Sequence, residues 1–306
     1  MVRTAILLII TIVLLPLLTF KLDPQALSPD QWHMLKVSGL IMFTTSLMCF
    51  TIAELTGNCS QVDKIWSVMP VIYAWYFSYA SNFDHRVLLM ALCVTIWGVR
   101  LTYNFSRRGA YRLKFWEGEE DYRWAVVREN PMFKGNPWRF KLFNLVFISL
   151  YQNTLLWLFT LPALVAYSAI YKPLGWIDYL LAALFTGLVV LETIADQQQW
   201  NYQNEKIRRK NAGEKPLDGD HGFIRTGLWK YVRHPNYACE QTIWIVFYLF
   251  TIIPDGRWIN WGMTGCLLLL ILFQASADFS EGISTSKYPA YKDHINKIPR
   301  FIPRFW

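Results

Sequence analysis

The sequence has few charged residues, few cysteines and none of the common nucleotide-binding motifs. Charged residues make up 17% of the 306 positions, compared with about 25% in soluble domains, which argues against an ordinary water-soluble enzyme. The five cysteines contain no C-x-x-C pair, so no disulfide framework or zinc site is indicated. The five histidines form no H-E-x-x-H motif, and no metal site is expected. Neither G-x-G-x-x-G nor G-x-x-x-x-G-K-[ST] occurs, which excludes a soluble Rossmann or P-loop domain.

Apolar residues, in contrast, make up 54% of the chain and are grouped in blocks of about 20 residues, the length that a helix needs to cross a bilayer. They predict an all-α fold, a polytopic transmembrane helical bundle of about seven or eight spans that forms a single membrane-embedded domain. The sequence after the first block is a poor cleavage site, so we expect a retained span there and not a signal peptide. The candidate spans are residues 2–20, 35–55, 65–81, 87–104, 143–170, which could be broken, 174–196, 236–254 and 259–276.

The net charge of +8 has a simple explanation in such a protein. Of the 30 basic residues, 23 fall in three segments, near residues 100–142, 197–235 and 287–304, which two spans separate from each other. The positive-inside rule places these segments and both termini on the cytoplasmic side, and nucleic-acid binding is not expected. The first two segments are rich in aromatic residues, which predicts a folded cytoplasmic cap. We favour a bacterial inner membrane, with the endoplasmic reticulum as the alternative.

The densest polar cluster runs from Gly227 to Glu240 and includes Tyr231, Arg233 and His234. Pro235 is expected in the first turn of a span, and the spacing places Asn236, Glu240 and Trp244 on one helix face, beside Tyr237. An ionisable residue such as Glu240 inside a span is costly and is by default a functional hypothesis. The alternative is that Arg233 and His234 are only boundary cations and Asn236 a cap.

Two further clusters carry charge near the cytoplasmic boundary. Glu192 and Asp196 are four residues apart and should face the bundle interior, either to recognise a cofactor or to pair with basic loops. Arg100, Tyr103 and Arg107 share a helix face, and Arg108 follows. Because guanidinium groups match phosphate geometry, they are candidates for a phosphate clamp; contact with lipid headgroups is the alternative.

A polar turn between the second and third spans contains Glu54, Asn58 and Asp63. An acid there could polarise a substrate carbonyl, so these three residues are the candidate catalytic groups. The alternative is that Asn58 and Asp63 only cap helices.

Three of these motifs, A-D-x-Q at Ala195, G-L-W-K-Y at Gly227 and R-H-P-N-Y-x-x-E at Arg233, give the chain a family resemblance. It resembles integral membrane proteins with a steroid 5-alpha-reductase C-terminal domain, over residues 56–306, with a core motif at 192–244 that follows the N-terminal spans in 1–55. The R-H-P-x-Y element is shared with sterol reductases and isoprenylcysteine carboxyl methyltransferases. The resemblance implies NADPH bound on the cytoplasmic side by positions that match Arg100, Tyr103, Asp196, Arg233, Asn236, Tyr237 and Glu240.

The sequence departs from that family at two places. The Gln-Glu-x-Pro element is absent, and the basic run before the final Tyr-Pro is replaced by the segment from Ala275 to Ser284. Our first hypothesis is a membrane reductase that uses NADPH or NADH to reduce the carbon–carbon double bond of an enone in a steroid-like or isoprenoid lipid. The alternatives are an S-adenosylmethionine-dependent lipid or isoprenylcysteine-type methyltransferase, and a non-catalytic lipid-binding protein. The expected partners are the hydrophobic substrate and the bilayer.

Overall fold

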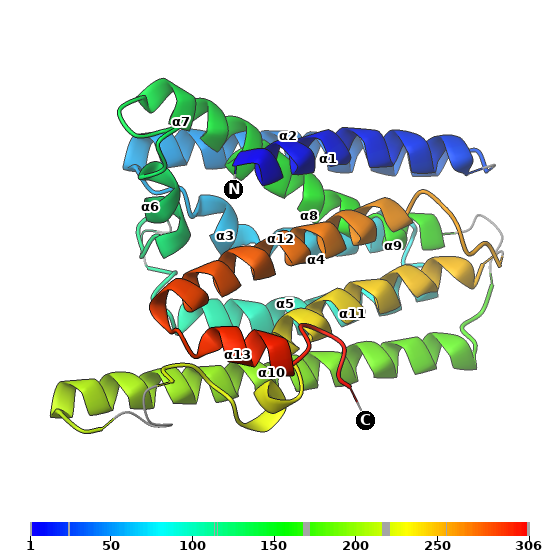
Figure 1. Cartoon of the computed structure of the whole chain (residues 1–306). Coiled ribbons are helices and arrows are strands. Elements are labelled where there is room, and N and C mark those ends of the chain that lie inside the picture. Colours follow the sequence, from blue (N-terminus) through cyan, green and yellow to red (C-terminus); the bar gives the residue numbers. More distant parts are fainter. Residues whose placement is uncertain are drawn as a thin grey trace.

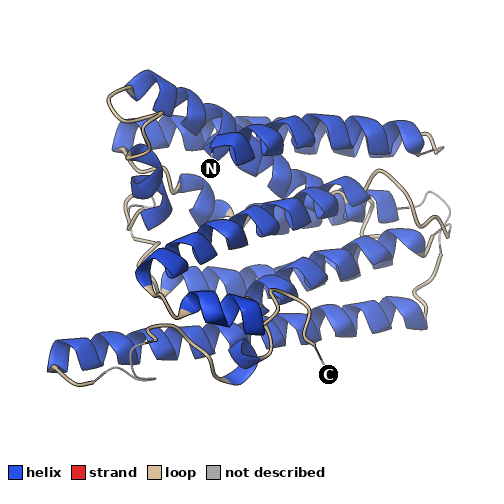
Figure 2. Cartoon of the chain, viewed as in Figure 1, coloured by secondary structure: helices blue, strands red, loops and turns tan. Residues whose placement is uncertain are grey.

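A computed structural model describes residues 2–23, 25–112, 114, 116–167, 172–215, 221–254 and 256–304. The regular elements in these ranges are all helices (Figure 2). In chain order they are α1 (Val2–Leu22), α2 (Pro29–Thr56), α3 (Gln61–Ile65), α4 (Met69–Ala80), α5 (His85–Ser106), α6 (Tyr122–Arg128), α7 (Pro137–Phe143), η1 (Asn144–Tyr151), α8 (Gln152–Thr160), α9 (Pro162–Ala166), α10 (Trp176–Ala212), η2 (Gly227–Lys230), α11 (Pro235–Leu249), η3 (Phe250–Ile252), α12 (Met263–Lys287) and α13 (Tyr291–Lys297).

Five of the described helical segments are long and apolar enough to cross a membrane. They are α2, α5, the continuous segment Pro137–Ala166, α10 and α12. The predicted polytopic helical membrane bundle is therefore confirmed. Two of the predicted spans correspond to α4, with 12 residues, and α11, with 15, and neither alone covers the roughly 30 Å hydrocarbon core. The finer count of seven or eight spans stays a prediction.

The long helices lie side by side, and the chain reverses direction between them (Figure 1). The ends of α2, α5 and α12 meet at the end of the bundle that also holds α3, α6 and α7, shown at the left. The connections that follow α1, α4 and α11 lie at the opposite end. The basic segments near residues 100–142 and 287–304 thus begin at the same end, which we call the basic end.

Local sequence sets the helix boundaries. α2 begins after Ser28, which forms a capping box with Gln31, and ends at Gly57, whose φ of 70° is easily adopted only by glycine. The predicted first-turn proline is confirmed, because Pro235 opens α11. In the block that could be broken, the helix widens into a π-helix at η1, and a new helix starts at Pro162.

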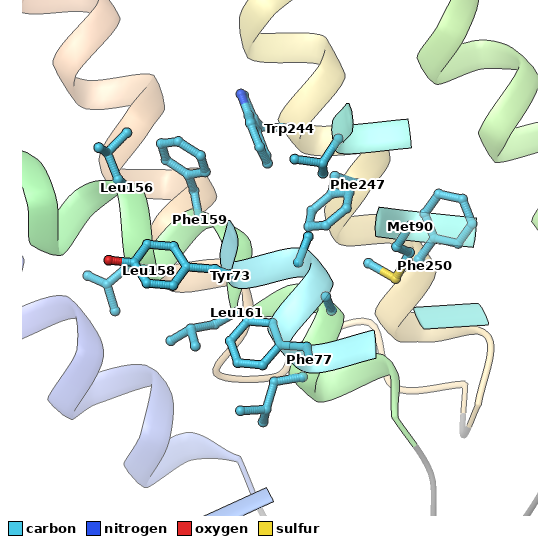
Figure 3. Packing of buried hydrophobic residues seen from close by; sticks show 14 of the residues in the cluster. Tyr73, Phe77, Met90, Leu156, Leu158, Phe159, Leu161, Trp244, Phe247 and Phe250 are labelled. Carbon is cyan, nitrogen blue, oxygen red and sulfur yellow. The ribbon is translucent and has the colours of Figure 1, made fainter. Parts of the chain in front are cut away.

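The core of the bundle is aromatic. Trp97 of α5 and Trp244 of α11 are almost fully buried, and their rings meet edge to face at a centroid distance of 5.0 Å. Figure 3 shows Trp244 with Phe159 and Phe247 around it. These rings bury a large apolar area, and they lie around Glu240, the one acidic residue of α11.

The predicted cap forms in the first long connection and in the last part of the second, where Phe223, Trp229 and Val232 are buried. Trp124, Val127 and Phe133, from α6 and the turn after it, are buried against the ends of α2 and η1. The first part of the second connection differs, because α10 continues to Ala212 and extends past the bundle (Figure 1). The prediction of a cap was wrong for residues 197–212. This stretch contains neither glycine nor proline, and helix-favouring pairs such as Glu205–Arg209, at 2.8 Å, keep it helical.

Candidate active site

A cavity of about 810 Å³ lies at the basic end of the bundle, between α3, α5, α6, α10, α11 and α12. Part of its lining is polar: Glu192, Asp196, Asn236, Tyr237 and Glu240. Another part is apolar: Leu8, Leu101, Phe147, Leu272 and Phe273. A cavity of this size that combines polar and charged groups with aromatic and aliphatic surface suits a small molecule with both a polar and an apolar part.

Glu240 is fixed by two indole groups. The Nε1–H of Trp97 donates to its Oε2 at 2.8 Å, and the Nε1–H of Trp244, one turn further along α11, donates to its Oε1 at 3.0 Å. The predicted shared face of Glu240 and Trp244 is therefore confirmed. Because both donors are themselves buried in the aromatic core, the carboxyl can rotate little and is presented to the cavity in one orientation.

Asp196 joins three helices at the polar part of the cavity. It accepts hydrogen bonds from Asn104 of α5 at 2.8 Å and from Asn236 of α11 at 3.1 Å, and it is paired with Arg100. Asp196 itself belongs to α10, so its carboxylate holds α5, α10 and α11 together. The expectation that Asp196 and Glu192 face the interior is confirmed, since both are buried.

Glu192 is less completely paired than its neighbours. Its Oε1 lies 2.8 Å from Nη1 of Arg100, and its carboxyl lies within hydrogen-bonding reach of the carboxyl of Glu240. Its Oε2 is buried and, among the described residues, has no hydrogen-bond donor. Three acidic side chains thus share one guanidinium group at this part of the cavity.

Arg233 and His234 are committed to the C-terminal segment. Arg233 pairs with Glu281 of α12 through Nε at 2.8 Å and donates to the backbone carbonyls of Ile295 and Ile298. Nε2 of His234 lies 2.9 Å from the same Oε1 of Glu281. Arg300 donates to the other oxygen of Glu281, Oε2, at 2.7 Å. Neither Arg233 nor His234 lines the cavity. Their neighbour Tyr237 does, and the ring of His234 stacks on it with a centroid distance of 5.3 Å.

Asp63 is the one member of the predicted catalytic trio that lines the cavity. It is buried, accepts a hydrogen bond from Nε1–H of Trp124 at 3.0 Å, and lies 3.7 Å from Nη2 of Arg123. Burial raises the pKa of Asp63 above its ordinary value, and the charge of Arg123 partly offsets this effect. An acid in this environment is suited to donate a hydrogen bond.

The other two members of the trio lie outside the cavity lining. Asn58 organises its own turn, because its side chain donates to the Gly118 carbonyl at 3.0 Å and accepts from the Ser60 amide at 2.9 Å. Glu54 is paired with Lys141 at 3.4 Å and accepts from Asn144 at 2.9 Å. Both therefore attach the cap segments to the end of α2.

The predicted phosphate clamp is only partly directed to the cavity. Arg108 is exposed and lines it, whereas Arg100 is occupied by Glu192 and Asp196. Arg107 donates to Asn104 and Gln197 and lies 4.6 Å from the ring centroid of Trp200. Tyr103 and Tyr231 are 64% and 52% exposed and do not line the cavity.

Sequence reasoning missed three residues of this site: Trp97, Asn104 and Glu281. Asn104 is four residues after Arg100, so the helical spacing could have included it. Glu281 lies in the segment that departs from the reductase family, where it and Asp278 are the two acids. Trp97 gave no signal, because a tryptophan in a span is normally a packing residue.

Comparison with known proteins places the chain in a family. A family model described as a protein of unknown function (DUF1295) matches residues 49–298. The chain is 35% identical over 280 residues to the uncharacterized protein C594.04c of Schizosaccharomyces pombe, which covers 88% of this chain and 79% of that protein. No solved structure matches the chain. The matched region includes the whole of α3, α5, α6, α10, α11 and α12, which line the cavity. Because the family model covers most of the chain, the chain belongs to the DUF1295 family of membrane proteins.

Proposed function

We propose that this protein is a membrane-embedded reductase that uses a nicotinamide dinucleotide, NADPH by preference, to reduce the carbon–carbon double bond of an enone in a steroid-like or isoprenoid lipid. One observation carries the proposal. The motif residues that resemble those of steroid 5-alpha-reductases, Asp196, Asn236, Tyr237 and Glu240, line a single cavity, together with apolar side chains from α5 and α12.

The residues present suit the cofactor in two respects. Asp196 and Glu240 line the cavity with carboxyl oxygens, which can accept hydrogen bonds from the carboxamide N–H groups of a nicotinamide. Arg108 lines the cavity with an exposed guanidinium group, which suits a phosphate. When bound, the cofactor would supply hydride; Asn236 and Glu240 would orient its ring. Arg100 and Arg233 are better explained as positioning residues, because their guanidinium groups are already paired.

The apolar part of the cavity suits a lipid acceptor. Leu101, Leu272 and Phe273 offer surface for rings or an isoprenoid chain. Asp63, whose pKa is raised by burial, would donate a hydrogen bond to the substrate carbonyl and so make the double bond more electrophilic. Seven or eight spans with the basic end in the cytoplasm would let the cofactor arrive from water and the lipid from the bilayer.

The test is cofactor binding to the purified protein in lipid nanodiscs. We expect saturable NADPH binding by calorimetry, and Arg108→Ala should weaken it about tenfold or more, because a charge-assisted hydrogen bond contributes roughly 1.5–3 kcal/mol. Arg112→Ala is the matched control, since Arg112 is an exposed arginine of the same segment that does not line the cavity. Binding of S-adenosylmethionine with no binding of NADPH would refute the proposal.

A methyltransferase is the second candidate, and one feature favours it. Among the residues that the structure describes, Arg100 is the one guanidinium group that contacts Glu192 and Asp196, with Glu240 beside them. Such an acidic surrounding suits the positive sulfonium of S-adenosylmethionine. In this case methyl transfer to a lipid or prenylated thiol would require Glu240, and NADPH would have no effect. The same binding experiment separates the two candidates.

A further inference from the structure

The carboxyl groups of Glu192 and Glu240 form a contact that does not fit two ionised side chains. They lie within hydrogen-bonding reach of each other, and both residues are buried, with 5% and 6% of their surface exposed. Two negative charges at such a distance repel strongly where water is scarce. A proton between the two carboxyls removes this repulsion and supplies the donor that their contact lacks.

The surroundings indicate which carboxyl holds the proton. Glu240 accepts two hydrogen bonds, from Trp97 and Trp244, so each of its oxygens already has a donor. Glu192 has one oxygen near Arg100 and a second, Oε2, for which the described residues provide no donor. An ionised Glu192 would leave that oxygen buried and unsatisfied, whereas a protonated one can use it as the donor to Glu240.

The other charged and titratable groups around the pair do not replace this proton. Arg100 of α5 is the only cation that contacts it among the described residues, and it is shared with Asp196 of α10. Cys239 of α11 lies beside both Glu192 and Glu240 but supplies no positive charge. Asp278 of α12 lines the same cavity but is paired with Arg300 at 2.7 Å. Arg100 therefore balances one of the three acids, not all of them.

We propose that Glu192 and Glu240 share one proton at neutral pH and that Glu192 is the proton donor to the bound lipid. This role rests on the reductase function proposed above. The O–H bond of Glu192 would break and its proton would join the substrate carbon next to the carbonyl. When bound, the reduced nicotinamide dinucleotide would supply the hydride for the other carbon of the double bond and would be left oxidised. Glu192 then recovers a proton from water at the cavity mouth. Asp63 remains the hydrogen-bond donor to the carbonyl and is not consumed.

The proton itself can be observed without any substrate or cofactor. Infrared spectroscopy of the protein in nanodiscs distinguishes a protonated from an ionised carboxyl group. Besides the contribution of a protonated Asp63, we expect a protonated-carboxyl band at pH 7 that is lost in Glu192→Gln and reduced or shifted in Glu240→Gln. Glu281→Gln is the matched control, because Glu281 is a buried glutamate surrounded by Arg233, His234 and Arg300, and it should leave the band unchanged. A band that is unchanged in both Glu192→Gln and Glu240→Gln would overturn the shared proton.

The donor role has its own measurement. Glu192→Gln preserves size and can still donate to Glu240, so the fold and NADPH binding should persist. Turnover should fall about 100-fold or more, as expected when a general acid is removed, and the basic limb of the pH profile should be lost. Turnover within twofold of the wild type would overturn the donor role. If wild-type protein shows the band but neither binds NADPH nor reduces enones, the reductase function and this donor role fail, and the shared proton stands.

Discussion

Helices α5 and α10 meet in buried ion pairs at both ends of the bundle, and the two pairs differ in their balance. At the end opposite the cap, Arg86 and Asp178 form a two-point contact, at 2.6 and 3.2 Å, with 3% and 0% of their side chains exposed. At the basic end, Arg100 faces Glu192 and Asp196 together, with Glu240 beside them. The first pair is neutral and enclosed, whereas the second is acidic and opens to a cavity.

This difference separates structural from functional charge in one helix pair. Asp178 is also satisfied by the Gly175 amide at 2.8 Å, so nothing more is needed at that end. At the other end, three acidic side chains share one arginine, and one carboxyl oxygen, Oε2 of Glu192, has no donor among the described residues. These groups line a cavity. A buried charged group that is fully paired indicates a role in the fold, and one that is left partly unpaired beside a cavity indicates a role with a ligand.

The largest expected effect is at the neutral pair. Asp178→Asn removes the charge that balances Arg86 and leaves a cation buried without its partner, which should cost about 3–5 kcal/mol. Thermal or denaturant unfolding in detergent measures the loss. Arg208→Ala is a control, because Arg208 is 54% exposed and such surface pairs contribute about 0–1 kcal/mol. Equal losses for the two variants would remove the distinction between the buried and exposed pairs.

An intermediate effect concerns acid sensitivity of the basic end. Burial, together with the nearby Arg225 and Arg233, lowers the pKa of His294 in α13 to about 4. A histidine whose folded pKa lies below its unfolded value of about 6.5 stabilises the fold at neutral pH, and this contribution is lost as the pH falls from 6.5 towards 4. Between pH 7 and 5 the wild type should therefore lose about 1–2 kcal/mol from this residue.

The check is unfolding at both pH values with His294→Phe, which cannot titrate and fits beside Phe223, 5.0 Å away in the wild type. The variant should lose less stability than the wild type between pH 7 and 5. His33→Phe serves as the control, since His33 is exposed on α2. A pH dependence that is the same in the wild type and in His294→Phe would show that His294 is not responsible.

The smallest expected effect is at the acidic cluster, and it sharpens the comparison most. Glu192→Gln should change stability by less than about 1 kcal/mol, because the amide reproduces a protonated carboxyl. The substitution matches Asp178→Asn in chemistry but occurs at the unbalanced end. Unfolding of the two variants side by side tests this. A loss of about 3–5 kcal/mol in Glu192→Gln would mean that Glu192 is ionised and pairs with Arg100 as Asp178 pairs with Arg86.

Local sequence predicted the helices more reliably than it predicted side-chain partners. The apolar blocks, the proline that opens α11 and the inward faces of Glu192 and Asp196 follow from hydropathy and helical spacing. Spacing along the chain does not predict that Arg233 and His234 bind Glu281, which is about 47 residues away. The reason is that a guanidinium group on one helix could reach several acids. The prediction of a cap was wrong for residues 197–212 for a related reason. Aromatic content indicates that a segment is ordered, but it does not show whether the segment folds over the bundle or continues as a helix past it.

The sequence by itself determined that this protein is a polytopic helical membrane protein, because apolar blocks of span length have no other stable arrangement in a bilayer. It also determined which short segments carry the ionisable residues. The tertiary structure alone decided which of those residues share a cavity. Asp63, Asp196 and Glu240 come together there, whereas Glu54, Tyr103 and Arg233 are directed elsewhere. The physical reason is that burial and charge balance depend on which helices pack together, and spacing along one helix does not specify its neighbours.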